Sequence, residues 1–194
     1  MGDMDKELIE KAKGGDKQAF AELFDSYKDR IFGYIYRYVG DYQSAQDLTV
    51  ETFLNAYNNL SKYEERGIFS SWLYRIATNC AKKELRRRNQ RKEVSLEEPV
   101  ADESDNLNLG GIAADENTRP DNEASRKELK YYIYKVVRRL DKKYKDVLLL
   151  CVVEGMEYEE AAKILKCNPV TVGTRLRRAR KILYDILKKH GFQF

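Results

Sequence analysis

The chain has 194 residues, with 36 Lys and Arg against 32 Asp and Glu, and a net charge of +4. Charged residues make up 35% and hydrophobic residues 42%, which is typical of a polar globular protein. It contains no apolar run long enough to cross a bilayer, and its acidic start at Met1–Lys6 lacks the pattern of a signal peptide. We therefore expect a cytoplasmic protein without direct membrane insertion. No spacing typical of disulfide frameworks or zinc sites occurs among Cys80, Cys151, Cys167 and the single His190. We therefore expect the cysteines to be core thiols, and we expect no metal or cofactor.

Residues 1–95 predict a helical domain, because apolar residues recur every three or four positions without strand-like alternation. Two glycines at 14–15 end a short first helix, and Asp16 is the expected cap of the second. Gly40 ends that second helix, and Ser44 is the expected cap of the third.

The third predicted helix carries a stripe of mixed character on its outer side. The stripe consists of Asp47, Val50, Glu51 and Leu54. Apolar side chains beside acidic ones are typical of a protein-binding surface, although isolated acids on a helix are more often simply solvated.

Residues 63–79 combine an aromatic loop with the start of a basic helix, which we expect to begin at a Ser70 cap and to reach about Arg88. Polar and basic side chains recur along this helix at helical spacing, at Arg75, Asn79, Lys82 and Arg86. Single-stranded DNA needs this combination, because cations hold its phosphates while rings or a pocket accept unstacked bases. The alternative is that Phe69 and Trp72 fill the core.

An acidic segment separates the two ends of the chain. Residues 97–124 hold nine acidic side chains and one basic one, with prolines and glycines among them, which predicts a linker without regular structure. On either side lie basic regions, with seven basic and two acidic side chains in residues 82–96 and 18 against 8 in residues 125–194. This distribution favours nucleic acid as the partner, whereas solvated helix faces are the alternative explanation.

The C-terminal residues 125–194 predict a second helical domain. A helix over about 125–140 is followed by another that ends at Gly155. Residues 158–165 then form a short helix, and Asn168 with Pro169 opens a long final one. Two helices joined so tightly predict a helix-turn-helix, with an ordinary basic helical hairpin as the alternative.

The second helix of such a motif enters the major groove of DNA by its N-terminal turns. The side chains that this placement exposes are Thr171, Thr174, Arg175 and Arg178, and further charge comes from Arg177, Arg180 and Lys181.

Three segments carry a family resemblance: AQDLTVETF at residues 45–53, FSSWLYRIATN at residues 69–79, and RRAR at residues 177–180. In order and spacing they resemble the bacterial RNA polymerase sigma factors of the extracytoplasmic-function (ECF) group over nearly the whole chain. The resemblance implies an all-α fold of two small helical domains joined by a flexible acidic linker. Residues 1–95 would form a region 2-like domain, 96–124 the linker, and 125–194 a region 4-like domain with the helix-turn-helix.

The resemblance also implies the partners. Core RNA polymerase would bind the stripe of Asp47, Val50, Glu51 and Leu54. The minus-ten promoter element would be melted and captured by Tyr63, Arg66, Phe69, Arg75, Asn79, Lys82, Lys83 and Arg86. The minus-thirty-five element would be read by Thr171, Thr174, Arg175, Arg177 and Arg178. The linker would run through the polymerase toward the RNA exit path, and an anti-sigma factor, often membrane-bound, would restrain the protein until a stress or envelope signal arrives.

Two positions in the reading helix depart from the family pattern, since Val170 and Gly173 stand where the family commonly has glycine and a basic residue. Other functions remain as alternatives, above all a stand-alone helix-turn-helix transcription regulator, and also an adaptor that only docks on polymerase. A DNA recombinase is the enzymatic rival, but the chain has no nucleophile motif, no glycine-rich phosphate loop and no histidine partner beyond His190. We therefore expect a protein that is not an enzyme.

Overall fold

The computed structural model describes residues 3–64, 68–94 and 121–192, and the regular elements within these ranges are all helical. The N-terminal half (residues 3–94) contains α1 (Asp3–Lys13), α2 (Lys17–Val39), α3 (Tyr42–Asn59), the 3-10 turn η1 (Leu60–Lys62) and α4 (Phe69–Val94). The C-terminal half (residues 121–192) contains α5 (Asp121–Arg139), α6 (Lys142–Leu148), the π-helical turn η2 (Leu149–Val153), α7 (Tyr158–Leu165) and α8 (Pro169–Lys189). The predicted all-α class is confirmed.

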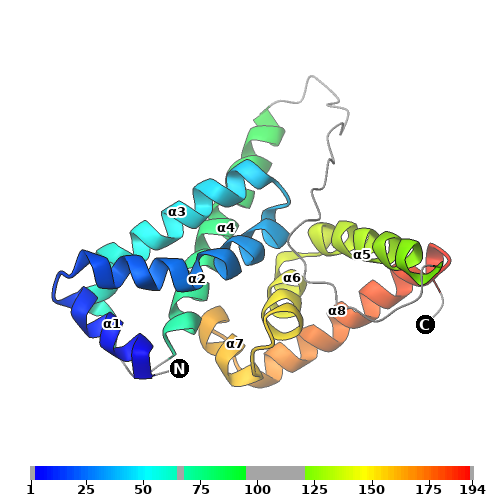
Figure 1. The fold of residues 1–194 in the computed structure, drawn as a ribbon. Helices are drawn as coiled ribbons and strands as arrows, with labels where there is room; N and C mark the ends of the chain where they lie inside the picture. The colour runs from blue at the N-terminus through cyan, green and yellow to red at the C-terminus, as the bar shows by residue number, and fades with distance from the viewer. Residues whose placement is uncertain (1–2, 65–67, 95–120, 193–194) are drawn as a thin grey trace.

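The two halves lie side by side (Figure 1). In that view α1 to α4 occupy one side and α5 to α8 the other, with α7 next to the N-terminal end of α4. Within the described ranges, none of the helices combines the length and the apolar character needed to span a membrane.

Most helix boundaries follow local capping chemistry. The Asp16 carboxylate accepts hydrogen bonds from two backbone N–H groups of the first turn of α2. Gly40 ends that helix in the left-handed region at φ 75°. The prediction that Ser44 caps α3 is wrong, because Asp41 caps it: the extended backbone of Asp41 lets its carboxylate accept a bond from the Ser44 backbone N–H at 2.7 Å. Ser44 instead lies in the first turn.

Two other boundaries differ from the sequence prediction. α4 begins at Phe69, one residue before the expected cap, and extends to Val94 rather than to Arg88. α5 begins at Asp121, inside the predicted linker. The rest of the predicted linker lies outside the described residues.

Buried side chains of the two halves form one continuous cluster rather than two separate cores. In the N-terminal half this cluster includes the fully buried rings of Tyr34, Tyr38 and Tyr74, and the Tyr34 hydroxyl is 2.8 Å from the Thr78 hydroxyl. Buried phenols need polar partners, because an unsatisfied hydroxyl in an apolar interior is costly. Tyr38 and Tyr74 find their partners in the C-terminal half, as described below.

Candidate polymerase and DNA interfaces

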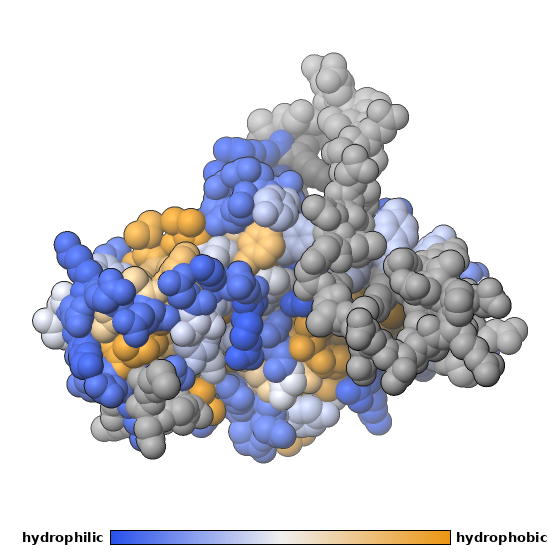
Figure 2. Space-filling view, viewed as in Figure 1, coloured by the Kyte–Doolittle hydropathy of each residue, from blue (hydrophilic) through white to orange (hydrophobic). Residues whose placement is uncertain are grey.

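The stripe predicted on α3 lies on the surface. Val50 is 55% exposed and Leu54 58% exposed, and Asp47 beside them is exposed as well. Glu51 is half-buried, with its carboxylate 3.8 Å from the Lys83 ammonium group. Figure 2 shows a hydrophobic patch over the outer side of α3. We call these four α3 residues the ridge, an apolar and acidic surface of the kind that binds another protein.

The aromatic rings of the predicted loop are buried, so they do not form an exposed surface on which bases could stack. Tyr63 is 5% exposed and Phe69 is 1% exposed, and both rings pack against Trp72. The ring centroids of Tyr63 and Phe69 lie 5.6 Å apart. These rings therefore anchor the start of α4 to the core and are covered in this arrangement. Arg66 lies outside the described residues.

The basic stripe on α4 is partly open and partly covered. Asn79, Lys83 and Arg86 are exposed and Arg75 is half-buried. Lys82 differs, because its ammonium group lies 2.6 Å from a carboxylate oxygen of Asp146 in the C-terminal half.

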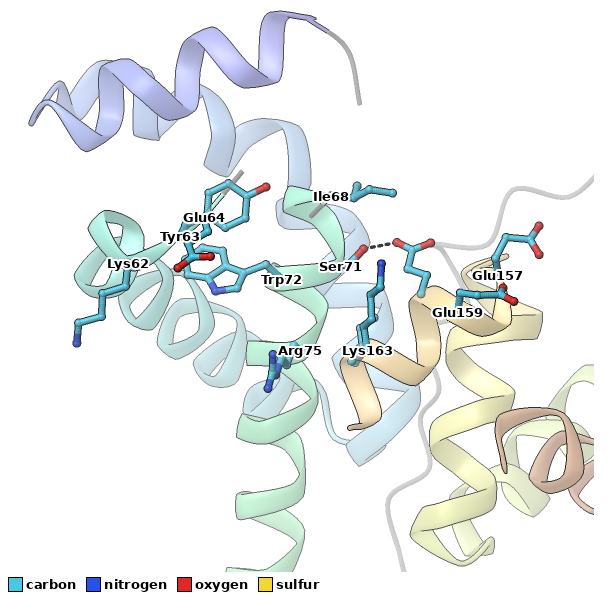
Figure 3. A pocket seen from close by; sticks show the side chains of 12 residues that line it. Lys62, Tyr63, Glu64, Ile68, Ser71, Trp72, Arg75, Glu157, Glu159 and Lys163 are labelled. Atoms are coloured by element: carbon cyan, nitrogen blue, oxygen red, sulfur yellow. Dashed lines mark hydrogen bonds between the residues drawn. The ribbon is translucent and has the colours of Figure 1, made fainter. Parts of the chain in front are cut away.

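A cavity of about 840 Å³ lies beside the N-terminal turns of α4, between this helix and α7. Figure 3 shows Ser71 on α4 directed toward α7, whereas Trp72 on the same helix extends to the side of Tyr63. One hydrogen bond crosses the gap, from the Ser71 hydroxyl to the Glu160 carboxylate. The full lining is Lys62, Tyr63, Glu64, Ile68, Ser71, Trp72, Arg75, Glu157, Glu159, Glu160, Lys163 and Ile164. The wall contributed by the C-terminal half is thus predominantly acidic.

Further contacts hold the two halves together, and we call them the interdomain interface. Asp146 is 4% exposed, and it accepts a hydrogen bond from the Tyr38 hydroxyl at 2.7 Å in addition to its contact with Lys82. Glu154 accepts a hydrogen bond from the Tyr74 hydroxyl and lies 3.4 Å from the Arg37 guanidinium group. Sequence reasoning missed all of these pairs.

Burial and neighbouring charges shift the pKa values of two side chains at this interface, Tyr38 and Lys145. Burial raises the pKa of Tyr38, and Asp146 raises it further, so the phenol remains a hydrogen-bond donor. Burial lowers the pKa of Lys145 to about 8, and the neighbouring Arg138 adds to that effect. The Lys145 ammonium group donates to the backbone carbonyls of Arg138 and Tyr38, the second of which belongs to the N-terminal half.

The helix-turn-helix has the predicted construction. The Asn168 side chain accepts from the Val170 backbone N–H at 2.9 Å and caps α8, which begins at Pro169. The two helices pack through buried Ala161, Ile164, Val172 and Leu176. Lys166 closes α7 at φ 52°, a left-handed conformation that favours glycine.

The predicted reading face of α8 is accessible. Thr174, Arg177 and Arg178 are exposed, while Thr171 and Arg175 are half-buried. Gly173 has a packing role, because a Cβ atom there would lie 3.3 Å from the ring of Tyr158. The Tyr158 ring therefore lies against Gly173, the position where the family commonly has a basic side chain.

Known proteins share this organisation. Residues 23–91 match the Sigma-70 region 2 family, and residues 130–183 match the Sigma-70 region 4 family. The RNA polymerase sigma-H factor of Pseudomonas aeruginosa is 33% identical over 186 residues, which cover 96% of this chain and 95% of the relative. The ECF RNA polymerase sigma factor SigW of Bacillus subtilis is 33% identical over 185 residues, with 95% and 97% covered. The chain belongs to the extracytoplasmic-function sigma factors.

Solved structures show the same fold. CnrH, in its complex with the cytosolic domain of CnrY, superposes with a TM-score of 0.69 at 22% identity, over 96% of this chain and 99% of CnrH. The sigma factor RpoE of Bartonella quintana, in complex with the anti-sigma factor NepR, gives 0.65 at 21% identity, over 87% of this chain and 96% of RpoE. As a sigma factor, this chain is a transcription initiation factor that associates with core RNA polymerase and binds promoter DNA.

Proposed function

We propose that this ECF sigma factor divides promoter recognition between its two halves. The ridge of Asp47, Val50, Glu51 and Leu54 binds core RNA polymerase. The observation that supports this assignment most strongly is that the fold leaves Val50 and Leu54 on the surface although their neighbours Leu48 and Phe53 are buried. Large apolar side chains held beside acids at the surface gain stability when a partner covers them.

The basic stripe of α4 binds the melted minus-ten element. The polar and cationic contacts come from Arg75, Asn79, Lys82, Lys83 and Arg86. Tyr63, Arg66 and Phe69 complete the set that captures the melted element. Flipped bases compensate for the loss of stacking when they enter a pocket next to such a stripe. The exposure of Asn79, Lys83 and Arg86 on one helix supports this role.

The reading helix α8 binds the minus-thirty-five element. The residues on its DNA-facing side are Thr171, Thr174, Arg175, Arg177 and Arg178. The arginine side chains among them can reach both bases and phosphates. The charge of α8 and the capped turn before it support this role.

Regulation is the remaining part of the proposal. The factor works in the cytoplasm, its acidic linker runs through the polymerase toward the RNA exit path, and an anti-sigma factor restrains it until an envelope or other stress releases it. The complex of the Bartonella quintana sigma factor RpoE with the anti-sigma factor NepR supports the last point.

Transcription with purified components tests the proposed function. The protein is mixed with bacterial core RNA polymerase and a promoter library, and the starts of the transcripts are sequenced. Start sites that share two spaced sequence elements are expected. Duplex DNA binding without any association with core polymerase would instead indicate the stand-alone helix-turn-helix regulator.

The variant Asp47→Arg tests the ridge itself. A reversed charge on an exposed side chain should abolish polymerase binding and leave the fold intact, because the bond that Asp47 accepts from the Gln43 amide at 3.3 Å is itself exposed. Pull-down with core polymerase and thermal unfolding measure the two properties. Normal binding of this variant would refute the assignment of the ridge.

A further inference from the structure

An apolar side chain is held open to water at the start of the reading helix. Val170, the second residue of α8, is 75% exposed, compared with 58% for Leu54 on the ridge. Valine is unusual here, because the family commonly has glycine at this position. A side chain so open to water gains free energy from a partner that covers it.

Val170 lies on the face of α8 that a helix-turn-helix presents to DNA. Val170, Thr174 and Arg178 recur every four residues, so they share one face of the helix, and all three are exposed. Val172 and Leu176 lie between them in the sequence and are buried. The N-terminal residues of the second helix of this motif contact base edges in the major groove. Val170 is therefore placed to touch a base.

The first turn of α8 carries no charged or amide side chain. Residues 169–173 have the sequence PVTVG, and the first basic side chain of the helix is Arg175. The Asn168 side chain, just before the helix, caps it by accepting from the Val170 backbone N–H. The Thr174 hydroxyl donates to the Val170 carbonyl oxygen at 2.9 Å. This turn thus lacks the arginine, lysine, glutamine or carboxylate that reads guanine, adenine or cytosine by hydrogen bonds.

Gly173 keeps the surroundings of Val170 free of charge as well. The family commonly has a basic side chain at position 173, which would reach toward bases or phosphates from the same turn. Here the Tyr158 ring takes that space, since a Cβ atom on Gly173 would lie 3.3 Å from it. The two departures from the family pattern therefore change the same turn from polar to apolar.

Thymine is the base that suits such a turn. Among the four bases, it presents an apolar group in the major groove, the C5-methyl group, which apolar side chains contact. Packing of the valine methyl groups against it removes apolar surface of both partners from water. Cytosine carries only a hydrogen at C5 and cannot make this contact.

We propose that Val170 is a specificity-determining residue, which selects thymine at one position of the minus-thirty-five element by packing against its C5-methyl group. The inference rests on the proposed function, because it requires α8 to read that element. It divides the work of the reading face. Arg175 and Arg178 supply charged contacts, and Val170 supplies discrimination by an apolar contact.

Deoxyuridine tests the contact, because it differs from thymidine only by lacking the methyl group. Holoenzyme is assembled from the full chain and core RNA polymerase, and competition binding uses the promoter recovered in the transcription experiment. Thymines on either strand of the minus-thirty-five element are replaced one at a time. At one position the replacement should weaken binding about fourfold, as expected for one methyl group returned to water.

Two valine variants show whether Val170 makes this contact. Val170→Ala should bind the thymine and deoxyuridine promoters nearly equally, and its promoter library should lose the enrichment of thymine at that position alone. Val153→Ala is the matched control, because Val153 is an exposed valine of the same half outside the helix-turn-helix. This control should retain the wild-type preference for thymine.

The remaining outcomes would overturn the assignment. Deoxyuridine could be tolerated at every position, or the wild-type preference could persist in Val170→Ala. A third such outcome is an equal loss of affinity of Val170→Ala for both promoters, which would place Val170 against a protein partner instead. Failure of the proposed function is distinct, because wild-type holoenzyme would then initiate no specific transcripts before any thymine is replaced.

Discussion

Truncation of Leu54 tests the energetic weight of the ridge. Leu54→Ala removes three carbon atoms, each worth about 0.8 kcal/mol when fully transferred out of water. Leu54 is 58% exposed in the free protein, so that share of its surface is available for polymerase to cover. The variant should therefore lose about 1.4 kcal/mol of binding free energy, which is about tenfold in Kd.

Competition binding to core RNA polymerase measures this loss, and thermal unfolding checks the fold. The free energy of unfolding should fall by no more than about 1 kcal/mol, because only the smaller part of Leu54 is already covered in the free protein. Val153→Ala is the matched control, since Val153 is 41% exposed but lies in the C-terminal half. An unchanged Kd for Leu54→Ala, or an equal loss for Val153→Ala, would refute the reasoning.

Three further predictions concern the C-terminal half. Arg175→Ala should weaken promoter binding by about 1–3 kcal/mol, and so reduce transcription, at promoters with the upstream element. An equal loss at promoters lacking that element would count against the assignment. Lys166→Gly should raise the free energy of unfolding in urea by up to about 1 kcal/mol, because glycine adopts the left-handed φ of 52° without strain; a decrease would contradict this reasoning. The folded-state pKa of Lys145 is lowered from 10.5 to about 8, so the unfolded chain binds this proton more tightly. The difference in unfolding free energy between the wild type and Lys145→Met should therefore increase from pH 8 to pH 10, as measured by urea titration. A difference that stays constant with pH would exclude the burial effect.

Local features were predictable because the interactions that create them span only a few residues. Asp16 caps a helix through N–H groups two and three residues away, and Asn168 caps α8 through the N–H group two residues away. Gly40 marks a helix end because its left-handed φ is open to glycine. The predicted cap Ser44 had a rival within three residues, and the backbone conformation of Asp41 decided between them.

The site was predictable to the extent that surface exposure follows helical periodicity. The ridge on α3 and the reading face of α8 are both outward stripes whose opposite sides are buried. Tyr63 and Phe69 did not follow this rule, because whether an aromatic ring beside a loop faces the core depends on which other rings pack against it. The presence of glycine at position 173 is explained only by the structure, in which the Tyr158 ring lies next to it.

The sequence by itself determined the helices, several of their caps, the helix-turn-helix and the family, because these depend on periodicity and short motifs. Tertiary structure alone decided how the two halves meet. The Tyr38 hydroxyl and the Asp146 carboxylate are 108 residues apart in the chain and 2.7 Å apart in space. In the sequence Asp146 is indistinguishable from a solvated acid, and only the packing of α6 against α2 and α4 makes it a buried partner of Tyr38 and Lys82. Contacts between residues so far apart in the chain leave no local sequence pattern, because they arise from the packing of whole helices against one another.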